Sequence, residues 1–287
     1  MKKVLVLYKK TVFSLYKEKN VKVALRPKSG LLKSQWIRLI KADEEHTNTL
    51  NYIKLVLKKY SVSAKFYFRG GRVPFDEFDT IITVGGDGTF LRAAASTQHQ
   101  LILGVNSSLS FSVGRFCVAN INNFDQVIQK MKTGKYIQKN LQRLFLSLDN
   151  GKEKVNVMND ILIAHSNPAV LSRYIIKIDK KQEEQRSSGV WISTAMGSSG
   201  AIHSAGGKLL NPYSTDIQYL PRELYAGLNK PYQLKGGVLN RAQSIKIASL
   251  MPQGNIYIDG ANKVFPFSYG QELHVSLSKF PVQTILL

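Results

Sequence analysis

The sequence predicts an N-terminal α/β domain with a doubly wound sheet, followed by a C-terminal mostly β domain. In the first 125 residues, short aliphatic runs alternate with segments of helical periodicity, which is the pattern of a parallel sheet covered by helices. A glycine-rich turn, 85-GGDGT-89, joins one aliphatic run directly to a helix-like segment. From about residue 140 the chain becomes a series of short β-rich segments separated by turn residues.

The elements of the N-terminal half follow in chain order. Val4–Tyr8 is a continuous apolar run, which is typical of a strand buried on both faces of a parallel sheet. Residues 44–60 repeat apolar side chains at helical spacing, and residues 63–68 favour a second strand. Residues 79–84 then predict the strand that enters the glycine-rich turn. Further along, we expect a helix at 90–96, a strand at 101–106 and a helix at 122–134.

The C-terminal half consists of short segments rich in β-branched and aromatic side chains, separated by turn signals. We therefore expect two domains, an α/β domain over 1–125 that carries the GGDGT loop and a β-rich domain over 126–287. The C-terminal tail is expected to pack back on the first domain. The predicted strands of the second domain lie at 141–149, 154–164, 173–179, 189–194, 244–250, 255–259 and 272–278.

The charge balance is compatible with an anionic partner, although it is a weaker indication than the motifs. The 287 residues include 40 Lys and Arg against 19 Asp and Glu, which gives a formal net charge of +21. Such a charge suits nucleic acid, a membrane surface or a phosphorylated small molecule. The basic residues are scattered in pairs and triples instead of forming one block with interleaved aromatic side chains, as a nucleic-acid groove would favour. We therefore expect a solvated basic surface with local phosphate sites, and no nucleic-acid partner.

The single cysteine and the N-terminal segment indicate the cellular compartment in which the protein is expected. Cys117 is the only cysteine, so no intrachain disulfide is expected, and no Cys and His spacing suggests zinc. Lys9 interrupts the first apolar run, which is too short for a signal peptide or a membrane span. We expect a cytoplasmic protein without a membrane partner.

The turn 85-GGDGT-89 has the chemistry of an anion site with one anomaly. Glycines between a strand and a helix let backbone N–H groups approach a phosphate. Asp87 would repel that phosphate unless its carboxylate holds a hydroxyl or a metal ion. The alternative is a plain Asp87-Gly88 turn with Thr89 as N-cap, and spacing alone leaves both interpretations open. The loop lacks the spacing of the G-x-x-x-x-G-K-[ST] and G-x-G-x-x-G nucleotide motifs.

Four motifs follow one another along the chain. The first is a strand followed by GGDGT, a helix and a short strand that ends in 104-GVN-106. The second is the pair Asn159-Asp160, the third is 186-RSSGVWISTAMGSSGAIHSAGGKLLNP-212 and the fourth is 257-YIDG-260. In this order the four motifs resemble the NAD kinase family, whose segment R-S-D-G-x-x-x-S-T-P-T-G-S-T-A-Y-x-x-S-A-G-G is similar to the third. Together they span most of the chain and are far more specific than the glycine turn alone.

Several residues depart from the family pattern. Ser188 replaces the aspartate of the family's Asp-Gly pair, Ala195-Met196 replaces Pro-Thr, and 199-SGA-201 replaces Thr-Ala-Tyr. The chain is closest in pattern to the divergent mitochondrial-type branch, in which that aspartate is also a serine. The serine therefore does not by itself imply an inactive protein.

The resemblance implies transfer of the γ-phosphoryl group of ATP to the 2′-hydroxyl of the adenosine ribose of NAD, giving NADP. Asp87 is the implied general base and a candidate ligand for Mg²⁺. The residues implied to cradle the donor phosphates are Gly85, Gly86, Gly88 and Thr89. Those implied to contact NAD are Asp87, Gly88, Asn106, Asn159, Asp160, Arg186, Ser188, Ser199, Gly200, Ala201 and Ser204.

The resemblance also implies ATP as phosphoryl donor, Mg²⁺ as cofactor, a β-rich domain that binds the dinucleotide, and a homodimer or homotetramer. The sequence leaves polyphosphate open as an alternative donor and NADH as an alternative acceptor. Lipid kinases of the diacylglycerol or sphingosine kinase type share the GGDGT loop, although they lack the Asn-Asp pair and the S-A-G-G run. A catalytically silent dinucleotide sensor, which the altered stretch 195–201 suggests, is a further alternative.

Overall fold

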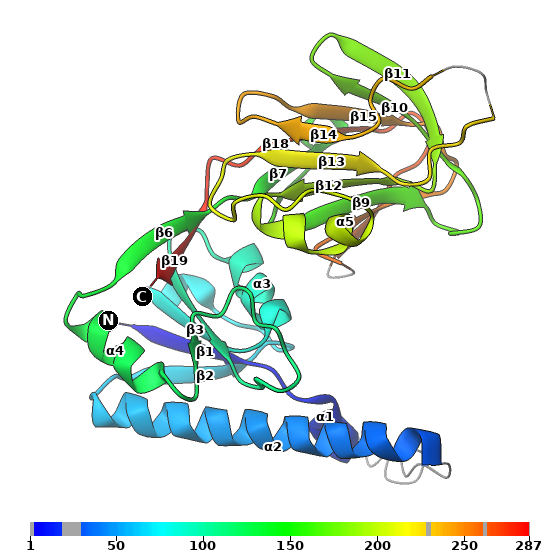
Figure 1. Ribbon diagram of the computed structural model, residues 1–287. Coiled ribbons are helices and arrows are strands. Elements are labelled where there is room, and N and C mark those ends of the chain that lie inside the picture. Colours follow the sequence, from blue (N-terminus) through cyan, green and yellow to red (C-terminus); the bar gives the residue numbers. More distant parts are fainter. Residues whose placement is uncertain (1–2, 19–29, 228–230, 261–262, 287) are drawn as a thin grey trace. The chain divides into compact units, whose positions relative to one another are not determined.

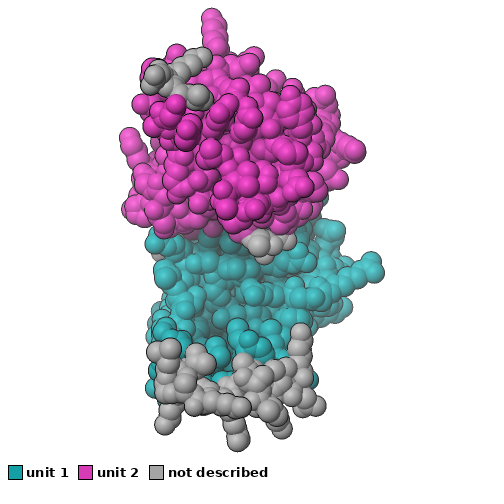
Figure 2. Space-filling model, turned by 90° about the vertical axis from the view of Figure 1, so that its right-hand side faces the viewer, with its two compact units in different colours: residues 1–139, 282–287 teal, residues 140–281 magenta. Residues whose placement is uncertain are grey.

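The computed structural model describes residues 3–18, 30–227, 231–260 and 263–286. The chain divides into two compact units, which are residues 1–139 with 282–287 and residues 140–281 (Figure 2). Each unit has a hydrophobic core of its own. The domain limits expected from the sequence stay a prediction. In the described ranges, no helix has both the length and the apolar character needed to cross a membrane.

The first unit is built on one seven-stranded sheet. In spatial order it contains β2 (Ala64–Phe68), β1 (Val4–Tyr8), β3 (Thr80–Gly85), β4 (Leu101–Asn106), β19 (Val282–Leu286) and β6 (Ile137–Leu141), with β5 (Ala119–Asn120) paired to β4. The pairs from β2 to β4 are parallel, as are those of β4 with β5 and with β19. All six residues of β3 are buried, because helices cover both faces of the sheet.

Helices lie on both faces of this sheet (Figure 1). They are α1 (Val12–Glu18), α2 (Gly30–Lys59), α3 (Asp87–Ser96) and α4 (Phe124–Lys132), with a 3-10 turn at Phe75–Glu77. Buried side chains of α2 and α4 share one core with β1, β3 and β4. Helix α3 contacts β3 and β4 and has no side chain in that core, which places it on the opposite face. The doubly wound α/β arrangement is therefore confirmed.

The second unit consists of two antiparallel six-stranded sheets. One contains β11 (Lys181–Ser187), β10 (Ser172–Ile178), β15 (Ile245–Ser249), β18 (Glu272–Leu277), β7 (Leu144–Leu148) and β8 (Glu153–Val157). The other contains β14 (Gly237–Leu239), β13 (Ile217–Pro221), β12 (Val190–Thr194), β9 (Asp160–His165), β16 (Gly254–Ile258) and β17 (Lys263–Pro266). Buried aliphatic side chains from both sheets form one core, which confirms the mostly β character of the C-terminal part.

Two helices begin earlier than the sequence predicts. Helix α2 starts at Gly30 instead of residue 44, and the rings of Phe13 and Trp36 lie 5.3 Å apart where α1 meets α2. This aromatic contact packs the first half of α2 against α1. Helix α3 starts at Asp87 instead of residue 90, so the last three residues of GGDGT form its first turn.

One predicted strand is in fact two. The apolar run at 154–164 divides at Met158-Asn159 into β8 and β9, which belong to different sheets. A continuous run of β-forming residues does not reveal such a crossing, because both strands bury alternate side chains in the same core. The crossing leaves Asn159 and Asp160 at the start of β9, where the chain changes sheets.

Candidate active site

In the first unit, the GGDGT residues lie where β3 ends and α3 begins. Gly85 is the last residue of β3, Gly86 is the N-cap of α3 and Asp87 is the first helical residue. Oδ1 of Asp87 accepts a hydrogen bond from the backbone N–H of Phe116 at 2.9 Å. The Asp87 side chain is only half-buried, so it is held at one oxygen and still reaches solvent. A carboxylate in the first turn of a helix is also stabilised by the N–H groups there.

Close packing explains two of the glycines. A Cβ on Gly85 would lie 2.2 Å from Oγ1 of Thr89, and a Cβ on Gly86 would lie 2.3 Å from Oγ of Ser112. Cβ atoms do not approach other atoms this closely, so neither position accepts a larger residue without a shift of its neighbour. These glycines therefore allow the turn to pack against Thr89 and Ser112, in addition to leaving the backbone open to a ligand.

Thr89 does not cap α3, as the plain-turn interpretation requires. The cap is Gly86, and no side chain hydrogen-bonds there. Oγ1 of buried Thr89 accepts a hydrogen bond from Nη1 of Arg69 at 3.2 Å, and the Thr89 N–H donates to the Gly86 carbonyl at 2.9 Å. Both groups are engaged within the unit, and contact between Thr89 and a donor phosphate stays a prediction.

Asn106 organises the serine-rich loop that follows β4. Its Nδ2 donates to the Ser112 carbonyl at 2.9 Å, and its Oδ1 accepts from the Ser108 N–H at 3.1 Å. The side chain is almost fully buried. Asn106 thereby holds Ser112 over Gly86, and direct contact of Asn106 with NAD stays a prediction.

Helix α2 supports the same loop through its polar face. Oγ of Ser108 donates to Oε2 of Glu45 at 2.9 Å, and Nδ1 of His46 lies 2.8 Å from Oγ of Ser107. Burial, and secondly the positive charge of Lys9, lowers the pKa of His46 to about 4. His46 is therefore neutral at physiological pH and acts here as a hydrogen-bonding residue.

In the second unit, Asp259 organises the predicted pair Asn159-Asp160. Its Oδ2 accepts a hydrogen bond from the Met158 N–H at 3.2 Å, and its Oδ1 accepts from the N–H of Asn159 at 2.6 Å and of Asp160 at 3.4 Å. Three consecutive backbone donors thus converge on one buried carboxylate. This arrangement fixes the chain where it crosses from β8 to β9.

A glycine allows the loop after β12 to lie directly against Asn159. A Cβ on Gly197 would lie 2.1 Å from the Asn159 carbonyl oxygen, and Oγ1 of Thr194 bridges the same region by donating to the Met158 carbonyl at 2.9 Å. The Gly197 N–H in turn donates to Oγ1 of Thr194 at 2.9 Å. The structure thereby brings the 3-10 turn Met196–Ser199 beside the Asn-Asp pair.

Gly200 lies next to the carboxylate of Asp160, since a Cβ at Gly200 would be 3.5 Å from its Oδ2. Ser199 precedes it at the end of the 3-10 turn, and Ala201 and Ser204 bound the short helix α5 (Ala201–Ser204) that follows. Oδ1 of Asn159 is buried without a hydrogen-bond partner among the described residues. A buried acceptor of this kind is suited to a polar ligand.

Burial, and secondly the negative charge of Asp259, raises the pKa of Asp160 to about 6. Burial also raises the pKa of Asp259, although its three backbone hydrogen bonds oppose this change. Two carboxyls that share one buried site do not ionise independently. Asp160 is the member of the pair that lies beside the Gly200 loop.

The structure does not bring Arg186 and Ser188 together with Asp160. Ser193 pairs with Asp160 across β12 and β9, whereas Ser188 precedes the opposite end of β12. Arg186 lies on β11 in the other sheet, where its Nε is 3.8 Å from Oε1 of Glu184. Contact of Arg186 and Ser188 with NAD stays a prediction. Within this unit, the two residues lie in a different place from the Asn-Asp pair.

Two residues that organise the site were not singled out from the sequence. Asp259 belongs to the 257-YIDG-260 motif, so the motif itself was the available signal. Phe116, whose N–H holds Asp87, carries no signal, because any residue other than proline supplies a backbone N–H.

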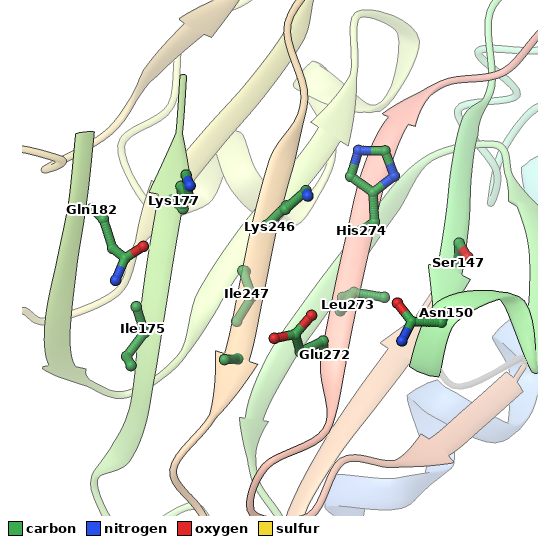
Figure 3. A pocket seen from close by; sticks show the side chains of 11 residues that line it. Ser147, Asn150, Ile175, Lys177, Gln182, Lys246, Ile247, Glu272, Leu273 and His274 are labelled. Carbon is green, nitrogen blue, oxygen red and sulfur yellow. The ribbon is translucent and has the colours of Figure 1, made fainter. Parts of the chain in front are cut away.

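A separate hollow of about 580 Å³ lies on the outer face of the sheet that contains β10, β15 and β18 (Figure 3). Lys177 pairs with Lys246 across β10 and β15, and Lys246 pairs with His274 across β15 and β18. The described residues that line this hollow include none of the predicted site residues. This hollow is therefore distinct from the predicted site residues.

Comparisons with known proteins agree with the motifs. Residues 12–136 match the family model described as the ATP-NAD kinase N-terminal domain. A probable NADH kinase of Oryza sativa subsp. japonica is 29% identical over 265 residues, covering 84% of this chain and 81% of that protein. An NADH kinase of Arabidopsis thaliana is 31% identical over 275 residues, covering 84% of this chain and 83% of that protein.

Two solved structures share the fold. A crystal structure of an NAD kinase from Archaeoglobus fulgidus in complex with ATP has a TM-score of 0.70 at 20% identity and covers 98% of this chain and 92% of that one. A yeast NADH kinase complexed with NADH has a TM-score of 0.72 at 17% identity, covering 100% and 84%. With its motifs, its fold and its similarity to the Arabidopsis protein over most of both sequences, the chain belongs to the NAD kinase family.

Proposed function

We propose that this protein transfers the γ-phosphoryl group of ATP to the 2′-hydroxyl of the adenosine ribose of NAD, forming NADP and ADP. The observation that carries the proposal is the state of Asp87. Its carboxylate is oriented by the Phe116 N–H at 2.9 Å, lies at the start of α3 and remains partly open to solvent. A carboxylate held in this way beside a glycine turn is suited to accept a hydrogen bond from a substrate hydroxyl.

In the proposed reaction, the 2′-oxygen attacks the γ-phosphorus while the bond to the β,γ-bridging oxygen breaks and ADP departs. Asp87 accepts the proton of the hydroxyl and later releases it to solvent. Phosphoryl transfer depends chiefly on alignment and on stabilisation of phosphate charge, so a weak base that is well placed is sufficient. The backbone of Gly85, Gly86 and Gly88 is proposed to face the donor phosphates.

Asn159 and Asp160 are proposed to hold the adenine and ribose groups of the dinucleotide. The buried Oδ1 of Asn159 and the Asp160 carboxylate beside Gly200 support this role, since both are acceptors and the ribose supplies hydroxyl donors. Ser199, Ala201 and Ser204 are proposed to contact the dinucleotide beside them.

Mg²⁺ is proposed as the cofactor, and the side chains present are compatible with it. In the part of the chain that the structure describes, no three His, Cys, Asp or Glu side chains form a ready metal site. Mg²⁺ commonly binds through one or two carboxylates together with substrate phosphates and water, and the half-exposed Asp87 would hold it. When bound, the ion neutralises charge on the transferring phosphates.

NADH is proposed as a second acceptor. The rice and Arabidopsis relatives are named NADH kinases, and the yeast enzyme is complexed with NADH. The reacting ribose is identical in NAD and NADH, so the chemistry at the 2′-hydroxyl is unchanged.

We further propose that the protein forms a homodimer or homotetramer, which sedimentation would test. We also propose that it is located in the cytoplasm, which cell fractionation would test.

The test is NADP formation by purified protein supplied with Mg-ATP and NAD. Asp87→Asn keeps the shape of the side chain and removes the base, so we expect kcat to fall by roughly 100- to 10,000-fold while NAD binding, measured by calorimetry, is retained. The exposed Asp76→Asn in the same unit is the matched control and should keep full activity. Full activity in Asp87→Asn, or phosphorylation of diacylglycerol without NADP formation, would contradict the proposal.

A further inference from the structure

Two cations lie close to the glycine turn. Lys9 follows β1 directly and Arg69 follows β2 directly, and the order of these strands beside the turn is β2-β1-β3. All three strands are parallel, so both residues and the turn lie at the same carboxyl edge of the sheet. Open α/β sheets bind their ligands outside this edge.

The side chains of both cations approach the turn. Cδ of Lys9 lies 3.5 Å from where a Cβ on Gly85 would be, and Nη1 of Arg69 lies 3.4 Å from where a Cβ on Gly88 would be. Nη1 of Arg69 also donates to Oγ1 of Thr89 at 3.2 Å. One cation therefore borders the first residues of the turn and the other borders the last.

The backbone at both cations is held in place. The Lys9 N–H donates to the Val84 carbonyl at 3.2 Å, and the Arg69 N–H donates to the Tyr8 carbonyl at 2.9 Å. These bonds continue the pairing of the sheet by one residue beyond each strand. The position of the two cations relative to the turn is thus a property of the sheet and does not depend on a free loop.

Both cations are half-buried, and within the described ranges neither forms an ion pair with a carboxylate. Burial, and secondly the charge of Arg69, lowers the pKa of Lys9, and burial lowers the pKa of Arg69. Partly desolvated like charges without a counter-ion are unfavourable, and they are usual where a ligand supplies the opposite charge.

We propose that Lys9 and Arg69 bind the condensed phosphates of the phosphoryl donor at the glycine turn, Lys9 beside Gly85 and Arg69 beside Gly88. The inference rests on the proposed function, because it identifies the side chains that hold the donor. Lys9 would contribute a point charge, whereas the planar guanidinium of Arg69 can donate to a phosphate oxygen while it remains bonded to Thr89. The shared ligand chemistry is a chain of phosphates, which occurs in ATP and in inorganic polyphosphate.

The experiment measures binding of four ligands by calorimetry to the wild-type protein and to Lys9→Gln and Arg69→Gln. The ligands are ATP, inorganic tripolyphosphate, adenosine and NAD. We expect each substitution to lower the affinity for ATP and for tripolyphosphate by roughly 10- to 100-fold, as for loss of a charge-assisted hydrogen bond. The affinities for adenosine and for NAD should not change. Lys65→Gln and Arg72→Gln, at exposed positions on and after β2, are the matched controls and should bind all four ligands as the wild type does.

Thermal unfolding separates ligand binding from a structural role. Removal of an unpaired, partly desolvated charge that repels its neighbour should leave the melting temperature of Lys9→Gln equal to that of the wild type or higher. A structural role predicts a lower melting temperature with unchanged ATP binding, and that result would overturn the inference.

Other outcomes also decide the matter. Three results would overturn the inference. They are an unchanged affinity for ATP in both variants, a lower affinity for NAD with an unchanged affinity for ATP, and a wild-type protein that binds neither ATP nor tripolyphosphate. ATP binding that depends on Lys9 and Arg69 in a protein that forms no NADP would uphold it and would instead reject the proposed function. A lower affinity for ATP with an unchanged affinity for tripolyphosphate would also overturn the inference, because the side chains would then recognise the nucleoside.

Discussion

At the residue scale, the carboxyls of Asp160 and Asp259 show how one short segment is both fixed and made sensitive to pH. Asp259 accepts three backbone hydrogen bonds from residues 158–160, whereas the Asp160 carboxyl faces the Gly200 loop. Burial and the charge of Asp259 raise the pKa of Asp160 to about 6. The folded protein therefore retains a proton on Asp160 over a pH range in which the unfolded chain has lost it.

This raised pKa predicts the sign of a stability change. Below pH 3.8, the ordinary value for Asp160, the carboxyl is protonated in both states, and stability falls as pH rises toward 6. A difference of about two pKa units corresponds to about 3 kcal/mol of unfolding free energy. His46 changes the stability of both proteins in the opposite direction over this range, because its pKa is lowered to about 4. The difference in unfolding free energy between Asp160→Asn and the wild type, measured in urea between pH 4 and 7, should therefore change by about this amount.

The exposed Glu153→Gln on β8 is the control for the pH experiment and should keep the wild-type profile. An identical pH profile in Asp160→Asn and the wild type would contradict the raised pKa. The same variant also tests the proposed dinucleotide contact, because a carboxamide accepts a ribose hydrogen bond less strongly than a carboxylate. NAD should therefore bind Asp160→Asn more weakly above pH 6.

At the scale of elements, β4 positions the segment that orients Asp87. A Cβ on Gly104 would lie 2.3 Å from the carbonyl oxygen of Phe116, so only glycine lets this segment lie against the strand. The ring of Phe116 stacks on Phe90 of α3 with centroids 4.9 Å apart. Strand β4 and helix α3 therefore hold Phe116 between them, and its N–H reaches Asp87.

Gly104→Ala should accordingly affect both stability and catalysis. The added methyl group meets backbone atoms that cannot rotate away, and overpacking of this kind typically costs about 1 to 3 kcal/mol. Displacement of Phe116 would also weaken its bond to Asp87, so we expect a lower kcat with a smaller change in KM for NAD. Urea unfolding and steady-state NADP formation measure the two effects.

Gly71→Ala is the control for this substitution, since a Cβ there makes only an ordinary contact of 3.5 Å with the Phe68 carbonyl oxygen. It should leave unfolding and turnover unchanged. If Gly104→Ala were also neutral in both measurements, the close approach of Phe116 would not be what orients Asp87.

At the scale of the whole molecule, the two units are not consecutive halves of the chain. Strand β19 belongs to the first unit, where Thr284 pairs with Ile102 of β4 and Ile285 is fully buried in the core shared with α2 and α4. The first unit thus requires residues from both ends of the sequence for a complete sheet, and this long-range pairing closes only after the second unit has been synthesised.

Ile285→Asp should destabilise the first unit by more than about 3 kcal/mol, because it buries a carboxylate in an apolar core. The two tryptophans allow each unit to be followed separately, since Trp36 lies in α2 and Trp191 in β12. In a Trp191→Phe background, Trp36 reports the first unit, and Ile285→Asp should lower the urea concentration at which its fluorescence changes. In a Trp36→Phe background, the transition of the second unit should change less.

The half-exposed Gln283→Asp on the same strand is the control and should leave both transitions near their wild-type midpoints. An unchanged first transition in Ile285→Asp would show that β19 is not part of the cooperative core. Equal shifts of both transitions would show that the two units unfold as one.

The class of both halves, the position of Asp87 in GGDGT and the other family motifs could all be predicted from the amino-acid pattern. These features are local, since a buried parallel strand is a continuous apolar run and a turn that needs close backbone approach needs glycine. The periodicity of the helices placed α4 well, whereas α2 begins before the segment expected from it and contacts α1 there.

The residues that orient Asp87 and the Asn159-Asp160 pair became visible in the folded protein alone. Asp259 lies about a hundred positions along the chain from the N–H groups whose hydrogen bonds it accepts. Phe116 bonds to Asp87 through its backbone N–H, which does not depend on the residue type. Arg69 and Lys9 reach the glycine turn because three parallel strands end at one edge. Ser188 lies away from Asp160 because it precedes the opposite end of β12, and Arg186 because it lies in the other sheet. Contacts between distant segments depend on sheet order and register, which local patterns of polarity do not specify.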